Sequence, residues 1–227
     1  MRVLPHDFPN WKLVYYYVST SRDANLWSKI HGALLTPTRR RAGREHDTPS
    51  AGRIDSSTVK APEGNDRGFD GGKKIQGRKR HKAVDTLGLL PSVVVTAGSV
   101  DDARTAPAVV CQPGPAKYPR MELLWADTKY HNLNDWVRNT YKGPIRIDVT
   151  KRTDAGKGFK PIRWRRVVAR TNGWVKRSRR NALDDEHNTS SSEAMIRITT
   201  TRIMLDRRTH PKPESPFRYP KKPKTSS

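Results

Sequence analysis

Two aspartates stand where a folded sheet could bring them together as a metal site. Asp55 lies inside the β-prone segment 53–59, and Asp127 ends the apolar run 123–126, a pattern typical of a buried strand with a polar residue at its carboxyl end. Phosphoryl transfer uses carboxylate oxygens to hold a pair of Mg²⁺ ions roughly 4 Å apart, and neighbouring strands can fix that separation. An ordinary interpretation stays open for both residues: Asp55 begins a turn with Ser56, and Asp127 caps a helix.

The charge of the chain favours a polyanionic partner. Its 227 residues contain 45 Lys and Arg against 22 Asp and Glu, which gives a formal net charge of +23. A field this positive attracts nucleic acid, the commonest polyanion of the cytoplasm, so DNA is the partner that we expect first. Charge alone does not separate an enzyme from a ribosomal or nucleoid-type binding protein.

Composition excludes other classes of protein. The single cysteine, Cys111, rules out an internal disulfide framework and a cysteine-based zinc site. Residues 1–7 lack the apolar stretch of a secretory signal, and the longest apolar run, residues 87–97, is too short to span a bilayer. We therefore expect a cytoplasmic protein with no membrane partner.

The elements that must position the two aspartates alternate between helix and strand. Asn10 and Asn25 are predicted to cap two short amphipathic helices at the front, and a polar basic linker is expected to follow. Strands that alternate with helices after an initial antiparallel set predict a mixed α/β sheet. The predicted order is strand 53–59, glycine-rich loop 64–77, hairpin 81–85 and 92–97, helix 101–110, strand 123–126, helix 134–141, strand 145–149 and helix 164–176.

Several longer stretches match the motifs of one family. Residues 54–60, IDSSTVK, follow the pattern I-D-S-x-x-V-K, and residues 125–130 follow W-A-D-x-x-Y. Residues 67–74 and 77–81 follow R-G-[YF]-D-x-x-K-K and G-R-K-R-H. In this order and spacing the chain resembles the DDE transposases of bacterial insertion sequences, in the insertion-sequence-five group. Two further stretches match at the ends, residues 4–17 and 191–205.

The resemblance implies an RNase H-like domain, a mixed sheet flanked by helices, over residues 53–205. Residues 1–36 would be the remnant of a helical DNA-recognition region, so we expect the chain to be shortened at its front, and residues 37–52 would be the basic linker. The tail 206–227 is basic and proline-rich, and we expect it to be disordered.

The resemblance also implies an activity. Asp55 and Asp127 would hold Mg²⁺ for cleavage of DNA at the ends of the element and for transfer of the freed strand into target DNA. The protein would act on the DNA of the insertion-sequence ends and of the target, as a homodimer.

The third catalytic motif departs from the family. The pattern Y-x2-R-x3-E-x6-K falls on residues 162–176, with Arg165 at the arginine, Lys176 at the lysine and Ala169 where the catalytic glutamate belongs. Without that carboxylate the two-metal site would be incomplete. The acidic residues 184–186 lie about four helical turns further on, so we do not expect them to replace it.

Five basic residues are candidates for contacts to DNA phosphates, namely Arg78, Lys79, Arg80, Arg165 and Lys176. For the last two, the solvated face of a helix is an equally ordinary interpretation. Three functions stay open: an active transposase, a catalytically dead remnant that only binds DNA, and an unrelated basic RNA-binding protein. An RNA-recognition module would carry aromatic residues on its strands, and the predicted strands have almost none.

Overall fold

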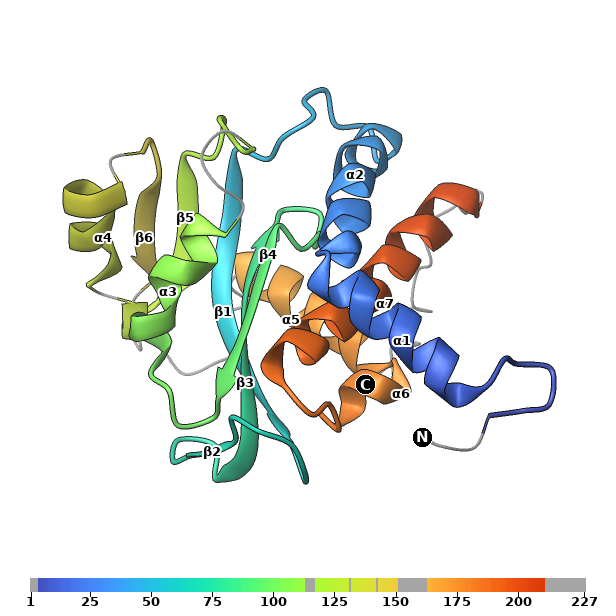
Figure 1. The fold of residues 1–227 in the computed structure, drawn as a ribbon. Helices are drawn as coiled ribbons and strands as arrows, with labels where there is room; N and C mark the ends of the chain where they lie inside the picture. The colour runs from blue at the N-terminus through green and yellow to red at the C-terminus, as the bar shows by residue number, and fades with distance from the viewer. Residues whose placement is uncertain (1–3, 113–116, 131, 142, 151–162, 211–227) are drawn as a thin grey trace, which may run out of the picture.

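The fold is a mixed sheet with helices on both faces, and a helical segment precedes the sheet at the N-terminus (Figure 1). This architecture confirms the predicted α/β class and is compatible with an RNase H-like fold. No helix among the described residues has the length and apolar character that crossing a membrane requires. A computed structural model describes residues 4–112, 117–130, 132–141, 143–150 and 163–210.

The sheet has an antiparallel half and a parallel half that meet at β1. In the described residues its strand order is β2-β3-β1-β5-β6, and β4 pairs with β3. β1 runs antiparallel to β3 and parallel to β5, so it is hydrogen-bonded on both sides. The strands are β1 Ala51–Lys60, β2 Gly68–Asp70, β3 Ile75–Asp85, β4 Ser92–Ala97, β5 Leu123–Asp127 and β6 Arg146–Thr150.

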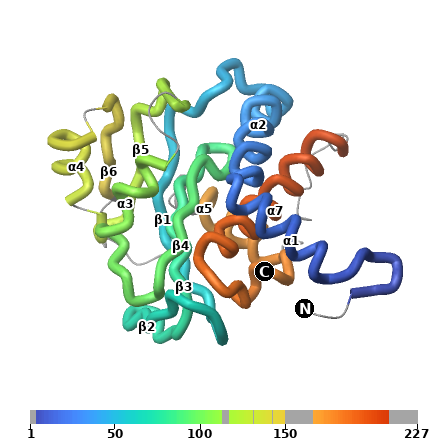
Figure 2. The backbone as a smooth tube through the Cα atoms, in the orientation of Figure 1, coloured from blue at the N-terminus to red at the C-terminus, as the bar shows by residue number. Residues whose placement is uncertain are grey.

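The helices cover the two faces unequally. One face carries α3, while α5 and α7 cover the other, and α2 packs along α7 (Figures 1 and 2). The longer helices are α1 Trp11–Asp23, α2 Leu26–Arg41, α3 Asp102–Cys111, α5 Arg163–Lys176 and α7 Thr189–Thr209. The short ones are η1 Thr128–Tyr130, α4 Leu133–Trp136, the π-helical turn η2 Val137–Tyr141 and α6 Arg179–Ala182.

Alternation along the strands produces two separate cores. Ile54 and Ala83 belong to a cluster that includes Val109 of α3. Val84, the next residue along β3, belongs instead to a second cluster that includes Val168 of α5. Because successive side chains of a strand point to opposite faces, cluster membership identifies the face of each neighbouring residue.

Local signals for the helix starts are partly confirmed. Asn10 caps α1 by accepting a hydrogen bond from the backbone N–H of Lys12 at 3.0 Å, and Asp101 caps α3 by accepting one from Ala103 at 2.8 Å. The prediction for Asn25 is wrong in its chemistry. Its backbone lies in the left-handed region at φ 53°, and its side chain makes no capping hydrogen bond.

Three predicted boundaries differ from the structure. α2 continues to Arg41 with Pro37 inside it, because Arg39 forms a buried ion pair with Asp85 that holds this part of the helix against the sheet. The expected loop 64–77 contains β2 and the start of β3. The first four residues of the expected disordered tail, 206–209, belong to α7, and residues 211–227 lie outside the described part of the chain.

Candidate active site

Asp55 and Asp127 lie at the same level of two parallel neighbouring strands. The register pairs Arg53 of β1 with Trp125 of β5, and two further residues along each strand bring Asp55 level with Asp127. β5 ends at Asp127, whereas β1 continues to Lys60. The sheet therefore places the two aspartates that the sequence singles out on neighbouring strands, each two residues beyond the last paired residue.

Both aspartates also belong to the same face of the sheet. Ile54 and Ala126, their neighbours in the chain, are buried in the core beneath α3. The side chains of Asp55 and Asp127 must then point to the opposite face, which α5 covers. Two carboxylates at one level on one face of a sheet form the kind of pair that a metal ion needs.

The two carboxyl groups have different surroundings. Burial raises the pKa of Asp55 above its usual value, and the charges of Lys82 and Arg53 offset this only in part. Asp127, at the strand end, is half-buried, and its Oδ1 accepts a hydrogen bond from the backbone N–H of Thr128 at 2.8 Å. A cation placed between them would favour the charged form of Asp55 and would offset the cost of its burial.

A buried lysine lies next to Asp55. Lys82 of β3 is the cross-strand partner of Asp55, and its side chain is 1% exposed. Its Nζ donates to Ser57 Oγ at 2.9 Å and also to Oδ1 of Asn172 on α5. Burial, with repulsion from Arg80, lowers the pKa of Lys82 to about 7, although the charge of Asp55 opposes this. Lys82 of β3 thus connects β1, the strand of Asp55, to the helix above it.

The third-motif helix lies over this face as its pattern predicts. Val168, Thr171 and Val175 are buried against the sheet side of α5. Ala169 is exposed and lies three residues before Asn172, on the same stripe of the helix. A methyl group at this position offers no oxygen to a metal.

Lys176 and Arg165 are the two basic residues of the same motif. Lys176 is exposed at the end of α5, as a phosphate contact would require. Arg165 lies near the start of the helix, and its side chain is outside the described part of the structure.

The donor set at this face is too small for two metal ions. Within the described residues, no group of three or more His, Cys, Asp or Glu side chains could hold a metal. Asp55 and Asp127 supply carboxylates that suit one Mg²⁺, but a pair of ions needs further oxygen ligands. The residues present therefore fit a single weakly held ion and do not fit the two-ion site of an intact enzyme.

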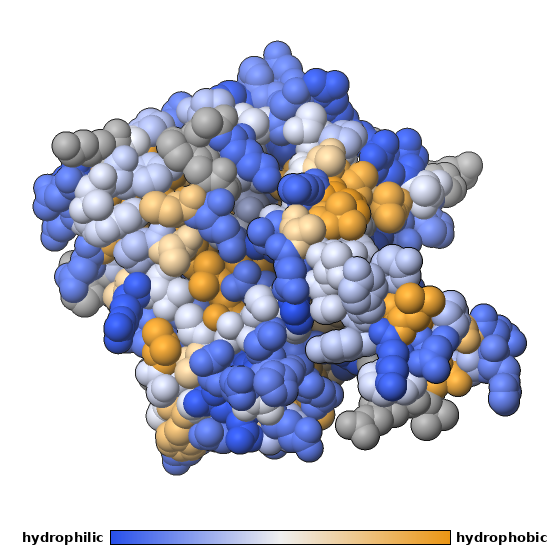
Figure 3. All heavy atoms as spheres, in the orientation of Figure 1, coloured by the Kyte–Doolittle hydropathy of each residue, from blue (hydrophilic) through white to orange (hydrophobic). Residues whose placement is uncertain are grey.

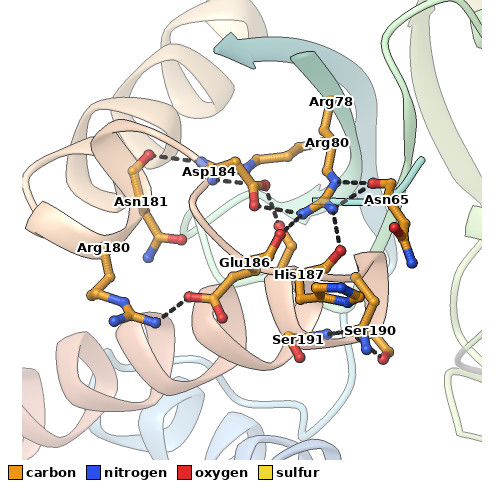
Figure 4. A network of polar contacts seen from close by, with 12 residues as sticks. Asn65, Arg78, Arg80, Arg180, Asn181, Asp184, Glu186, His187, Ser190 and Ser191 are labelled. Carbon is orange, nitrogen blue, oxygen red and sulfur yellow. Dashed lines mark hydrogen bonds and ion pairs between the residues drawn. The ribbon is translucent and has the colours of Figure 1, made fainter. Parts of the chain in front are cut away.

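Arg78, Lys79 and Arg80 do not lie in a basic surface loop. They belong to β3, in the interior of the sheet, and their exposed fractions are 0%, 7% and 2%. Asp184 accepts from Arg78 at 2.9 Å and from Arg80 at 3.3 Å (Figure 4). Arg78 and Arg80 of the run GRKRH are thus the partners of a buried carboxylate, and this burial argues against direct phosphate contacts from either side chain.

The network around Asp184 also fixes the segment between α5 and α7. Arg78 donates to the carbonyl oxygens of Glu186 at 2.7 Å and His187 at 3.0 Å, and Ser192 Oγ donates to Asp184 at 2.5 Å (Figure 4). Asp184 is fully buried and fully engaged in this network. It is therefore unable to serve as the missing third carboxylate.

On the α3 face, a second buried cluster surrounds Asp102. Lys79 Nζ lies 3.5 Å and His81 Nδ1 3.7 Å from Asp102 Oδ1. Despite this neighbour, burial lowers the pKa of His81 to about 4, so the imidazole is neutral near pH 7. Desolvation outweighs the attraction because His81 Nδ1 has no hydrogen-bond partner among the described residues. The cluster lies on the opposite face from Asp55 and Asp127.

The comparison with known families agrees with this geometry. A family described as the transposase DDE domain matches residues 46–204, from just before β1 to within α7. The chain belongs to the transposase DDE domain family. A search of curated proteins finds no match.

The region that matches the transposase DDE domain family contains every strand found in the described residues and both candidate aspartates. The sequence alone does not identify Lys82 and Asn172 of this transposase domain as neighbours of the candidate site. Lys82 is on the same face as Arg78 and Arg80, but its position opposite Asp55 depends on the β1–β3 register, which the sequence did not specify.

Proposed function

We propose that this chain is a DNA-binding transposase of a bacterial insertion sequence whose strand-cleaving chemistry is disabled at position 169. The observation that carries the proposal is the level alignment of Asp55 and Asp127 on the face beneath α5, together with Ala169 on that helix. The scaffold of the site is present, and one of the three carboxylates that the family pattern requires is absent.

DNA binding is supported by the net charge, by the hydrophilic surface and by exposed basic residues of α5. The net charge is +23, and hydrophilic side chains dominate the face shown in Figure 3. Lys176 is exposed at the end of α5, and Arg166 and Arg170 of the same helix are exposed as well. We propose insertion-sequence ends and target DNA as the partners, bound by a homodimer in the cytoplasm.

Mg²⁺ is the proposed cofactor, held by Asp55 and Asp127. When bound, such an ion would stabilise negative charge on a phosphate under attack. The residues of the chain would contribute orientation: the strand register fixes the two carboxylates, and Lys82 holds α5 against them through Asn172. Because the ligand set is short of oxygens, the chain as it stands would bind DNA without cutting it at an appreciable rate.

The test is the substitution Ala169→Glu. Ala169 is exposed, and Ala and Glu are both good helix formers, so the change should be tolerated. The natural chain, Ala169→Glu and a matched Ala169→Gln variant would be incubated with Mg²⁺ or Mn²⁺ and a supercoiled plasmid that carries the DNA flanking the gene. Ala169→Glu should nick the plasmid at least about 10³-fold faster than either of the others.

A further control ties the gain to the proposed site. Asp55→Asn in the Ala169→Glu background should abolish the restored nicking. If the natural chain cleaves as fast as Ala169→Glu, the proposal that position 169 disables it is wrong. If Asp55→Asn leaves the restored nicking intact, the metal-site assignment fails.

A further inference from the structure

A hollow lined by arginines lies away from the two aspartates, where α2, α7 and the turn after β3 meet. Its volume is about 190 Å³, and its lining residues are Thr38, Arg41, Ala42, Leu87 and Arg207. α2 and α7 are far apart in the sequence but pack side by side (Figures 1 and 2). The hollow therefore exists only in the folded chain.

Arg207 is a half-buried cation with donor capacity to spare. Its Nη1 is 3.5 Å from the carbonyl oxygen of Leu87, and its guanidinium lies 4.3 Å from the ring centroid of Trp174. Its Nη2 is buried and has no hydrogen-bond partner among the described residues. An unsatisfied buried N–H is costly, and an anion that reached Nη2 through the hollow would remove that cost.

Two further arginines, Arg41 and Arg170, lie close to Arg207. Arg41 lines the same hollow, is exposed, and donates to the carbonyl oxygens of Arg207 at 3.2 Å and His210 at 3.4 Å. Arg170 also stacks on Trp174, at 4.8 Å, and donates to Leu87 O at 3.4 Å. Within the described residues, no ion pair joins Arg41, Arg170 or Arg207 to a carboxylate.

Asp85 is the carboxylate whose charge acts on Arg207, and it is already engaged. Asp85 raises the pKa of Arg207, but burial and the charge of Arg170 have the larger effect, and the pKa is lowered overall. Asp85 is 2% exposed and forms its ion pair with Arg39. The arginines at the hollow therefore carry an excess of positive charge that no described side chain neutralises.

We propose that this hollow binds one phosphate group of a DNA backbone, with Arg41 and Arg207 as its ligands. The planar fork of a guanidinium matches two phosphate oxygens, which makes arginine the side chain best suited to this role. The proposal rests on the proposed function, because it assigns one anchor point for the same DNA. It adds a contact contributed by α2 and α7, outside the motifs that the family resemblance identifies.

The experiment measures affinity for a duplex of about 30 base pairs by fluorescence anisotropy, over a series of salt concentrations. Arg41→Gln should lower the association constant K for DNA about tenfold, because one phosphate contact is lost. The negative slope of log K against log[salt] should become shallower by about 0.9. Arg207→Lys keeps the charge but loses the fork, so it should weaken binding with a smaller change in slope. Arg104→Gln, an exposed residue of α3, is the matched control.

Inorganic phosphate provides a readout that does not depend on DNA. At 10 mM it should raise the Tm of the natural chain and of Arg104→Gln, and it should raise the Tm of Arg41→Gln less. Circular dichroism of each variant checks that the fold is retained. Of the matched pair Arg41→Gln and Arg104→Gln, only Arg41→Gln should lose both DNA affinity and phosphate stabilisation.

Three outcomes would overturn the inference. If Arg41→Gln binds DNA with the affinity and slope of Arg104→Gln, the hollow is not a DNA contact, while DNA binding by the chain stands. If phosphate stabilises the chain through Arg41 but DNA affinity is unchanged, the hollow binds a free anion. If the natural chain binds no DNA, the proposed function fails, and the phosphate measurement then shows whether the hollow binds any anion.

Discussion

Lys82 lies directly opposite Asp55 in the antiparallel register of β3 and β1, on the face of the sheet that α5 covers. The candidate carboxylate therefore has a cationic side chain of the protein itself as its neighbour. Lys82 is 1% exposed and donates to one oxygen on β1 and one on α5. Removing it should affect both the stability of the fold and the position of the helix.

Lys82→Met should change how stability depends on pH. Because the pKa of Lys82 in the folded state is about 7, the unfolded chain holds up to one more proton than the folded chain between pH 7 and 10.5. The free energy of unfolding should therefore rise with pH in that window, by roughly 2 kcal/mol from pH 7 to 9 for this group. Urea unfolding at the two pH values should show this rise in the natural chain and a smaller rise in Lys82→Met.

The matched control for that experiment is Lys60→Met, because Lys60 is an exposed residue of β1. It should keep the full rise between pH 7 and 9. An equal rise in Lys82→Met and Lys60→Met would mean that Lys82 stays charged in the folded protein.

Acid should destabilise the protein through two buried histidines. Burial lowers the pKa of His31 to about 3, with Arg197 and Lys117 adding repulsion, and burial also lowers that of His81 to about 4. Below pH 6.5 the histidines of the unfolded chain bind protons that the buried histidines of the folded chain do not bind. The free energy of unfolding therefore decreases as the pH is lowered. Each histidine should contribute a loss of about 2 kcal/mol between pH 7 and 5.

His31→Leu should remove one of these two contributions. The difference in unfolding free energy between pH 7 and 5 should shrink by about 2 kcal/mol relative to the natural chain. His6→Leu, at an exposed position, should leave the difference unchanged. Equal acid sensitivity in His31→Leu and His6→Leu would contradict the burial argument.

Asp184→Asn should be strongly destabilising. Asp184 is fully buried and is the carboxylate partner of Arg78 and Arg80, so the substitution leaves two buried guanidinium groups without their counter-charge. Breaking a buried ion pair in this way costs about 3–5 kcal/mol. Asp185→Asn, one residue further on and exposed, should change the free energy of unfolding by less than about 0.5 kcal/mol. Similar urea midpoints for the two variants would refute the role given to the network.

DNA binding should be salt-sensitive and weakly sequence-specific. If about six basic residues neutralise phosphates, log K should fall against log[salt] with a slope of about −5 on duplex DNA. Two duplexes of unrelated sequence should give similar slopes. A slope flatter than about −2 would mean that the net charge of +23 is not used to hold a DNA backbone.

The strands near the site could be predicted from the sequence because their signals are local. The apolar run before Asp127 and the alternation around Asp55 identify two strands. Each aspartate also lies in a motif of the same family, so the sequence links the two residues. The burial of the Arg78 and Arg80 side chains could not be predicted from such local signals. It depends on Asp184, more than a hundred residues later, which only the folded chain brings within hydrogen-bonding distance.

Helix α2 illustrates the same limit. Pro37 favours a break in the helix, and the basic residues after it resemble a linker. The ion pair between Arg39 and Asp85 keeps this turn helical, and the two residues come from distant parts of the chain. Tertiary contacts of this kind override local propensity and are not visible in the local pattern.

The anchoring of α5 does not involve the residue at position 169. The helix is held by its buried valines, by Asn172 through Lys82, and beyond its end by the cluster around Asp184. The packing of α5 therefore depends on other side chains than the one at the position of the third acid in the family pattern. Substitution at position 169 can therefore add or remove an acid without refolding the chain, so evolution can change this position while the shape of the domain stays the same.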